Sequence, residues 1–173
     1  MWLCSNCGET HEETFEACWK CGANRLDTAA TPATSSDEEL EHGVAIDRLV
    51  AQFFAAFSNT NGGARVRDVY ALCVPQAVIT KAVSDVPEIY LLHEFVEPRV
   101  ALLASGTLVD FVEHETSHDT FISGHVAQRR SSYQKSGVQN GERFTVNGVK
   151  VFQFVNTAAG WKITAVAWDD VDT

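Results

Sequence analysis

The sequence predicts an α+β protein in which a small four-cysteine module precedes a larger domain built of helices and then strands. Four of the five cysteines lie within the first 21 residues. Apolar residues recur at helical spacing between residues 46 and 73, and β-branched and aromatic residues dominate after residue 106. Helices followed by consecutive strands indicate an antiparallel sheet that is covered on one face.

The first segment carries the spacing of a metal site. Cys4, Cys7, Cys18 and Cys21 form two Cys-x2-Cys pairs that are separated by ten residues. Two such pairs supply the four thiolates that tetrahedral Zn²⁺ requires. Disulfides and a redox pair are the alternatives, but the chain begins with no export signal and a redox site needs only one pair. We therefore expect a structural zinc ribbon over residues 1–23, with His11 as a weaker fifth candidate ligand.

The segment after the cysteines is small, polar and poor in large apolar side chains, which predicts a flexible linker over residues 24–36. The main domain is then expected over residues 37–173. The formal charge is −10, and seven of these negative charges belong to residues 1–42. This acidity argues against binding to nucleic acid or to an anionic membrane. The chain has no apolar run long enough to span a bilayer, and we expect a cytoplasmic location.

The helical part of the main domain is predicted from periodicity. Apolar residues from Ile46 to Phe57 recur at helical spacing, Gly43 interrupts or delays this helix, and glycines at 62 and 63 end it. A second helix is expected from Val66 to Cys73, with Cys73 as a buried apolar residue. A short strand follows over residues 76–83. Residues 87–95 are expected to begin a further helix, with another turn after Pro98.

The remainder is predicted to form four strands. Their expected ranges are 108–116, 122–134, 143–155 and 160–168. Turn signals separate them at Gly124, at residues 136–137, 140–141 and 147–148, and at residues 159–160. Both faces of the first two of these ranges, 108–116 and 122–134, mix charged and apolar residues, so that alternation does not tell the inside of the sheet from the outside.

Several stretches of the main domain resemble the nuclear transport factor 2-like superfamily, in its ketosteroid-isomerase and polyketide-cyclase-like (SnoaL-like) branch, and most of all its uncharacterised bacterial members. The resemblance rests on residues 95–99, 124–129, 148–155 and 160–163 and on Trp168-Asp169-Asp170. It implies a cone, in which a bent antiparallel sheet wraps around the helices and leaves a pocket at its open end. It also implies a homodimer through the outer sheet face.

The first 21 residues resemble zinc ribbons and the Ran-binding-protein type of zinc finger. Members of that family bind single-stranded RNA or ubiquitin. Here no basic residue lies between Cys7 and Cys18, and His11 stands where the family usually has Asn. We therefore expect no RNA binding, and a structural role or a protein partner for this module.

Polar residues within apolar surroundings are the candidates for the pocket. They are His93, Arg99, Glu113, Gln128, Arg130, Tyr133, Trp168 and Asp169. If Glu113 and Arg130 both face inward, they are expected to pair, since a lone buried charge is costly. No motif of the superfamily's enzymes matches position by position, so no catalytic residue is assigned.

Two functions remain open at this point. The first is a non-catalytic protein that binds a small apolar ligand or a protein partner, and the sequence favours it because no catalytic pair can be named. The second is a cofactor-independent acid–base enzyme of the isomerase, dehydratase or cyclase type. A scaffold predicts a filled or purely apolar cavity. An enzyme predicts ionisable groups that converge in an apolar cavity, with at least one perturbed pKa.

Overall fold

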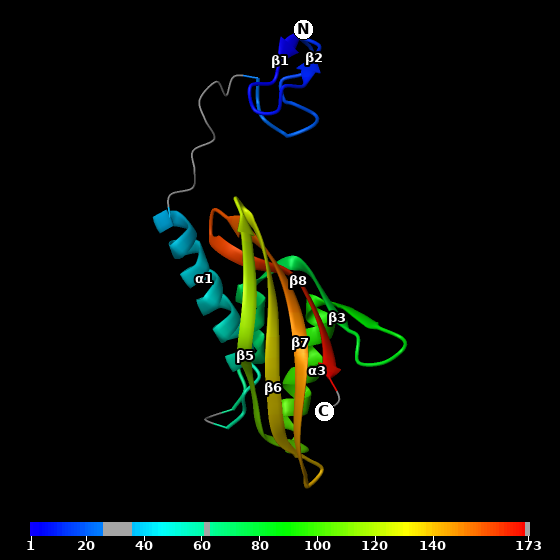
Figure 1. The fold of residues 1–173 in the computed structure, drawn as a ribbon. Coiled ribbons are helices and arrows are strands. Elements are labelled where there is room, and N and C mark those ends of the chain that lie inside the picture. Colours follow the sequence, from blue (N-terminus) through cyan, green and yellow to red (C-terminus); the bar gives the residue numbers. More distant parts are fainter. Residues whose placement is uncertain (26–35, 61–62, 172–173) are drawn as a thin grey trace. The chain divides into compact units, whose positions relative to one another are not determined.

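A computed structural model describes residues 1–25, 36–60 and 63–171, with side chains in α1 from residue 38 onward. The chain divides into two compact units, Met1–Glu38 and Glu39–Thr173 (Figure 1). The linker predicted over residues 24–36 lies almost entirely outside the described residues. None of the described helices is long and apolar enough to cross a membrane.

The N-terminal unit is built from two knuckles of the same design. Strands β1 (Trp2–Leu3) and β2 (Thr10–His11) pair antiparallel. The N–H of Gly8 donates to the carbonyl of Cys4, and the N–H of Gly22 donates in the same way to Cys18. Both glycines have positive φ, at 72° and 75°, which a residue without a Cβ adopts at little cost. The equivalent turns bring the two cysteine pairs into equivalent conformations.

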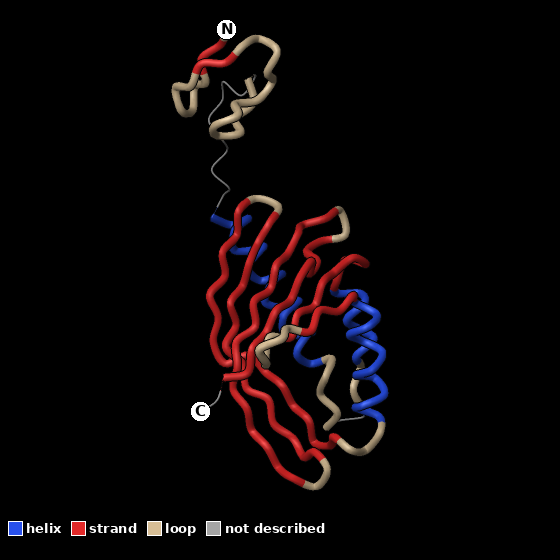
Figure 2. The backbone as a smooth tube through the Cα atoms, turned by 90° about the vertical axis from the view of Figure 1, so that its right-hand side faces the viewer, coloured by secondary structure: helices blue, strands red, loops and turns tan. Residues whose placement is uncertain are grey.

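The larger unit is a mixed six-stranded sheet that carries its helices on one face (Figure 2). The strand order is β4-β3-β8-β7-β6-β5, and all neighbours are antiparallel except the parallel pair β3–β8. The expectation of a purely antiparallel sheet is wrong at that one pair. The helical elements are α1 (Ser36–Ala55), η1 (Val66–Asp68), α2 (Val69–Leu72) and α3 (Leu92–Ala104). The strands are β3 (Cys73–Lys81), β4 (Glu88–Leu91), β5 (Leu108–Ser123), β6 (Val126–Gln139), β7 (Glu142–Thr157) and β8 (Gly160–Val171).

The sheet's inner face and the helices form one core. On β6 the residues at 127, 129, 131 and 133 are buried and their neighbours at 128 and 130 are exposed, as strict alternation requires. On β7, Phe152 and Phe154 lie on the same inner face, where Phe152 packs edge-on against Phe53 of α1 at 5.3 Å between ring centroids. Cys73 is buried in this core, as predicted.

Three local predictions are wrong. Helix α1 runs through Gly43 without interruption. Residues 88–91 form the edge strand β4, and α3 begins only at Leu92, where Glu94 accepts a hydrogen bond from the backbone N–H of Leu91 at 2.8 Å. The predicted turns at 136–137 and 147–148 lie inside β6 and β7. The other three turns, at Gly124, 140–141 and 159–160, are where the sequence predicts them.

Glycine at 137 and 148 serves close contacts rather than turns. A Cβ on Gly148 would lie 2.5 Å from the Tyr133 ring, its partner across the β6–β7 pair. A Cβ on Gly137 would lie 3.3 Å from the Cα of Phe111. Both residues therefore make room for a neighbouring strand's aromatic residue.

Candidate functional site

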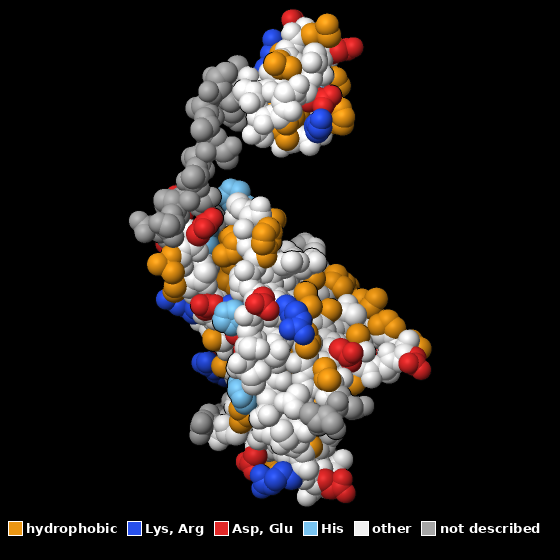
Figure 3. Space-filling model, viewed as in Figure 1, with side chains coloured by type: hydrophobic (Ala, Val, Ile, Leu, Met, Phe, Trp, Pro, Cys, Tyr) orange, Lys and Arg blue, Asp and Glu red, His pale blue; other side chains and the backbone are white. Residues whose placement is uncertain are grey.

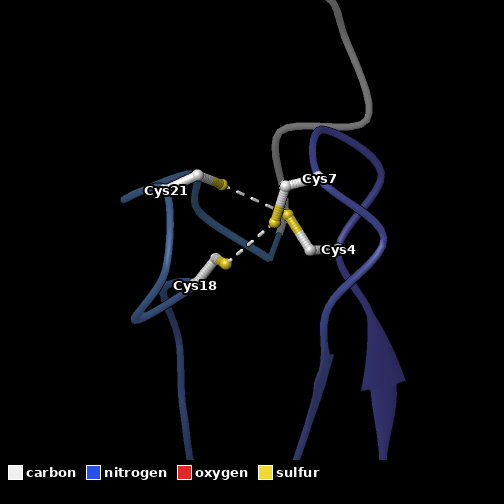
Figure 4. Close-up of side chains that lie close together, drawn as sticks. All are labelled: Cys4, Cys7, Cys18 and Cys21. Atoms are coloured by element: carbon white, nitrogen blue, oxygen red, sulfur yellow. Dashed lines mark hydrogen bonds between the residues drawn. The ribbon is translucent and has the colours of Figure 1, made fainter.

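The four N-terminal cysteines converge on one point. Their Sγ atoms all lie within 4.8 Å of one another, and the sulfurs of Cys4 and Cys21 and of Cys7 and Cys18 are 3.6 and 3.5 Å apart (Figure 4). A tetrahedral Zn²⁺ with Zn–S bonds of about 2.3 Å holds its sulfurs about 3.8 Å apart. The donor set and its spacing therefore fit a metal ion. Among the residues that the structure describes, this is the one group of three or more His, Cys, Asp or Glu side chains that could hold a metal ion.

His11 lies beside this cluster and supports it. Its Nε2 is 3.1 Å from the Sγ of Cys18, and its ring is buried 4.8 Å from that of Trp2, centroid to centroid. His11 therefore contacts Cys18, one of the four candidate ligands, and is not itself one of the four. Two other aromatic residues of this unit are exposed, Phe15 to 49% and Trp19 to 70%.

A cavity of about 220 Å³ lies inside the larger unit. Its apolar wall comes from α1, the turn that follows α1, α3, β5 and β8, through Phe53, Phe57, Phe95, Leu102, Leu103, Leu108, Phe111, Val166 and Trp168. Six ionisable side chains interrupt this wall: Lys81, Arg99, Glu113, Lys135, Lys150 and Asp170. The cavity is therefore neither filled nor purely apolar.

Glu113 and Lys150 form a buried ion pair in the cavity wall. Lys150 Nζ donates to Glu113 Oε1 at 2.6 Å, and both side chains are less than 9% exposed. The ammonium lies 3.8 Å from the centroid of the Tyr133 ring. Burial lowers the pKa of Lys150, and the carboxylate beside it opposes this shift.

A second ion pair joins β6 to β8. Lys135 Nζ contacts both carboxylate oxygens of Asp170 at 2.7 Å, and the hydroxyl of Tyr133 donates to Asp170 Oδ1 at 2.5 Å. Burial raises the pKa of Tyr133. The close approach of Tyr133 to this carboxylate depends on the missing Cβ of Gly148.

Arg99 is the cavity's one cation without an ion pair among the described residues. Lys81 pairs with Glu88, Lys135 with Asp170 and Lys150 with Glu113. The guanidinium of Arg99 lies 3.7 Å above the ring centroid of Phe95 and donates to the Phe95 carbonyl at 2.9 Å. Its surroundings are aromatic, and burial lowers its pKa.

Of the eight predicted pocket residues, the structure brings Arg99, Glu113 and Trp168 to the cavity wall. Tyr133 is buried behind the wall and contacts Lys150 and Asp170. His93 is exposed on α3, and Arg130 and Asp169 are exposed because strand alternation directs them outward. Gln128 lines a separate hollow with Phe121 and Thr164.

The expected pair of Glu113 with Arg130 is wrong, because Arg130 faces outward and Glu113 pairs with Lys150 of β7. Arg129, and not Arg130, is the inward residue, and it bridges Glu115 of β5 and Asp47 of α1. Sequence reasoning also missed Lys135, Lys150 and Asp170. Alternation with the inward Phe152 could have identified Lys150, but only once the face of the strand was known.

Comparison with known proteins supports the fold of the larger unit and does not identify its function. No family model matches the chain, and no curated protein matches it. Among solved structures, a nuclear transport factor 2-like superfamily protein from Salmonella enterica superposes with a TM-score of 0.65 at 11% identity, over 78% of this chain and 94% of that one. An NTF2-like protein from Novosphingobium aromaticivorans gives 0.61 at 15% identity, over 84% and 92%.

A candidate aromatic ring hydroxylase from the same Novosphingobium strain gives a TM-score of 0.63 at 21% identity, over 78% of this chain and 92% of that one. Other structural neighbours are a candidate scytalone dehydratase and candidate kinase association domains. Proteins with this fold thus carry names of candidate enzymes and of candidate association domains, and the fold does not choose between these two functions. The larger unit has the α+β cone fold of nuclear transport factor 2-like proteins, preceded by a four-cysteine cluster.

Proposed function

We propose that the cone binds a small, largely apolar molecule that carries an anionic group, and that Arg99 pairs with that group. The observation that carries this proposal is the unpaired guanidinium in an aromatic wall. Glu88 and Glu113 act on this half-buried cation only from beyond ion-pair distance, so that no direct counter-ion offsets its lost hydration. An anionic ligand would supply the missing charge, and the surrounding rings would bury its apolar part.

Titration calorimetry with benzoate and its neutral isostere benzamide tests this proposal. Loss of a charge-assisted hydrogen bond costs about 1.5–3 kcal/mol, so Arg99→Met should weaken benzoate binding about 10- to 150-fold and leave benzamide nearly unchanged. Arg130→Met is the matched control, because Arg130 lies on the outer face. Equal benzoate affinity in the wild type and in Arg99→Met would reject the proposal, as would no benzoate binding by the folded wild type.

Acid–base catalysis is the second candidate function, and the Glu113–Lys150 pair favours it. Two oppositely charged groups in contact within an apolar cavity match the enzyme expectation better than the scaffold expectation. Burial lowers the pKa of Lys150 and the Glu113 carboxylate opposes this shift, so that the two groups share their protonation equilibrium in one contact.

Phenylpyruvate provides a test of catalysis, since it combines a ring, a carboxylate and an acidic CH₂ group. In D₂O, an acid–base enzyme should accelerate deuterium exchange at that carbon, as followed by NMR. Glu113→Gln, assayed at a temperature at which circular dichroism shows it to be folded, should abolish the acceleration, and Arg130→Met should preserve it. Exchange at the uncatalysed rate with phenylpyruvate bound would leave ligand binding as the only function of the cavity.

For the N-terminal unit we propose a structural Zn²⁺ held by Cys4, Cys7, Cys18 and Cys21. Four thiolates and sulfur distances near the tetrahedral value support zinc over harder cations such as Mg²⁺ and Ca²⁺. Elemental analysis of the purified protein should give one zinc per chain, and less than about half of that would contradict the proposal. The exposed Leu3, Phe15 and Trp19 support a protein partner for this module.

We also propose that the outer sheet face pairs with a second copy of the chain. Exposed apolar residues gather over β3, β4 and the turn between them (Figure 3): Val78, Val83, Val86, Ile89 and Leu91. The same outward face continues through Val151 of β7 to Phe121 of β5, which is 64% exposed. Arg130 and Asp169 lie on the same face, and exposed apolar residues of this number among them support a protein interface.

A further inference from the structure

A second hollow adjoins the cavity at the β6–β7 hairpin. Its volume is about 590 Å³, and residues between 139 and 146 form its outer part. Five residues line both spaces: Leu102, Leu108, Phe111, Lys135 and Asp170. These five, here called the neck, therefore stand between the inner cavity and the outer hollow.

A strained bulge holds the apolar side of the neck in place. Between Val109 and Val112 the β5–β6 register shifts, so that Asp110 and Phe111 stand opposite Gly137 alone. Asp110 has a φ of 53°, which a residue with a Cβ rarely adopts, and such backbone persists only where its surroundings enforce it.

Asn59 supplies that enforcement from the segment after α1. Its side chain donates to the Leu108 carbonyl and accepts from the Phe111 N–H, both at 2.7 Å, and its own N–H donates to the Phe111 carbonyl at 3.1 Å. Three hydrogen bonds thus fix two neck residues, Leu108 and Phe111. Strained backbone that its surroundings enforce in this way is typical of ligand-binding sites.

The neck is apolar on one side and polar on the other. On its polar side Lys135 and Asp170 form an ion pair with each other, and the Tyr133 hydroxyl donates to the same carboxylate. Opposite them, Phe111 packs against Phe144 of the outer hollow at 6.4 Å between ring centroids, so that an apolar wall continues from one space into the next. A hydrocarbon segment that crosses the neck meets this wall and no unpaired charge.

We propose that the two hollows form one elongated site for an amphipathic carboxylate, with its anionic head at Arg99 and its apolar tail through the neck into the outer hollow. The inner cavity alone is smaller than the roughly 300–1,000 Å³ of common ligand sites, whereas the two spaces together fall within that range. The inference rests on the anion binding proposed above for Arg99 and adds the length and the chemical class of the ligand.

The test is calorimetric titration of straight-chain carboxylates of increasing length, from hexanoate to dodecanoate, below their micelle concentrations. The outer hollow carries Glu142 and Arg143 on the hairpin, and its apolar wall is formed by Leu102, Leu108, Phe111, Phe144 and Val146. Because the tail lies against this apolar wall, affinity should keep rising with length, by up to about fourfold per methylene. A plateau at the shortest members would overturn the proposal, since it would confine the ligand to the inner cavity. This readout needs no variant.

A matched pair of variants on β7 locates the tail. Val146 lines the outer hollow and does not line the inner cavity. Thr145, its neighbour in the chain, points to the other face of the sheet. Val146→Trp should remove the dependence on length and leave benzoate binding intact, which also reports an intact fold. Thr145→Trp should change neither. Long-chain binding that Val146→Trp leaves unaltered would overturn the proposal.

The two proposals fail in distinguishable ways. If Arg99→Met leaves all affinities unchanged while Val146→Trp shortens the range of ligands bound, the head assignment fails and the elongated site stands. If benzoate binding depends on Arg99 and chain length has no effect, the elongated site alone is rejected.

Discussion

Removing one member of the buried Glu113–Lys150 pair should destabilise the larger unit severely. Both side chains are nearly inaccessible, and their contact is 2.6 Å. In Lys150→Met the carboxylate of Glu113 loses its partner while it stays inside the core. In Glu113→Gln the ammonium is left in the same position, beside the aromatic rings of Tyr133, Trp168 and Phe54 and without its carboxylate.

The expected cost is about 3–5 kcal/mol for either single variant, because each leaves an uncompensated charge in the protein interior. For a unit of this size, that corresponds to a fall in Tm of about 12–20 °C. The double variant Glu113→Leu/Lys150→Met removes both charges and keeps the volume apolar. It should recover most of the loss, since well-packed apolar replacements of buried ion pairs are often neutral or stabilising.

Thermal and urea unfolding of the full chain, followed by far-UV circular dichroism, measures these three variants against the wild type. Arg67→Met, which removes the exposed pair with Glu97, serves as the control and should cost less than about 1 kcal/mol. Single variants as stable as this control would refute the reasoning. A double variant no more stable than the singles would show that packing, and not charge, sets the cost.

Three further predictions follow from particular residues. Gly148→Ala should lower the free energy of unfolding by about 1–3 kcal/mol, because the new methyl group forces the Tyr133 ring away. Gly43→Ala, in helix α1 with open space around it, should raise the free energy of unfolding by about 0.4–1 kcal/mol. Thermal melting measures both variants, and the reverse order of stability would contradict the packing described. Burial raises the pKa of Cys73 to about 12, so mass spectrometry after iodoacetamide treatment at pH 8 should find four labelled thiols in chelator-treated folded protein and the fifth only after unfolding. Val151→Glu on the outer face should convert a dimer to a monomer in analytical ultracentrifugation, and a wild-type monomer would reject the dimer proposal.

The parts of the fold that depend on local spacing could be predicted from the sequence. Cys-x2-Cys pairs with a following glycine determine a knuckle within a few residues, and the four sulfurs do converge. The turn at Asn140-Gly141 likewise needs only its own backbone, with both residues at positive φ. Gly137 and Gly148 look like turn residues in the sequence, yet each makes room for a neighbouring strand. Gly148 lies against the Tyr133 ring, and Gly137 lies against the bulge at Phe111.

The candidate site could be predicted only in part, because its charges are satisfied by residues distant in the chain. Glu113 meets Lys150 37 residues later, and Arg129 meets Asp47 82 residues earlier. Each charge gives its strand a mixed face, which hides the alternation that would mark the inside of the sheet. Asp170 was missed beside Asp169 for the same reason, since the two point to opposite faces of β8.

Anion binding at Arg99 is the central claim, and the position of a heavy atom in a crystal tests it most directly. Crystals of the full chain soaked with 4-bromobenzoate should show one anomalous bromine peak inside the cone. The carboxylate should lie within about 3 Å of the Arg99 guanidinium, and the ring against Phe95 and Trp168. A fully occupied bromine site elsewhere on the chain, with the cavity empty, would contradict the account.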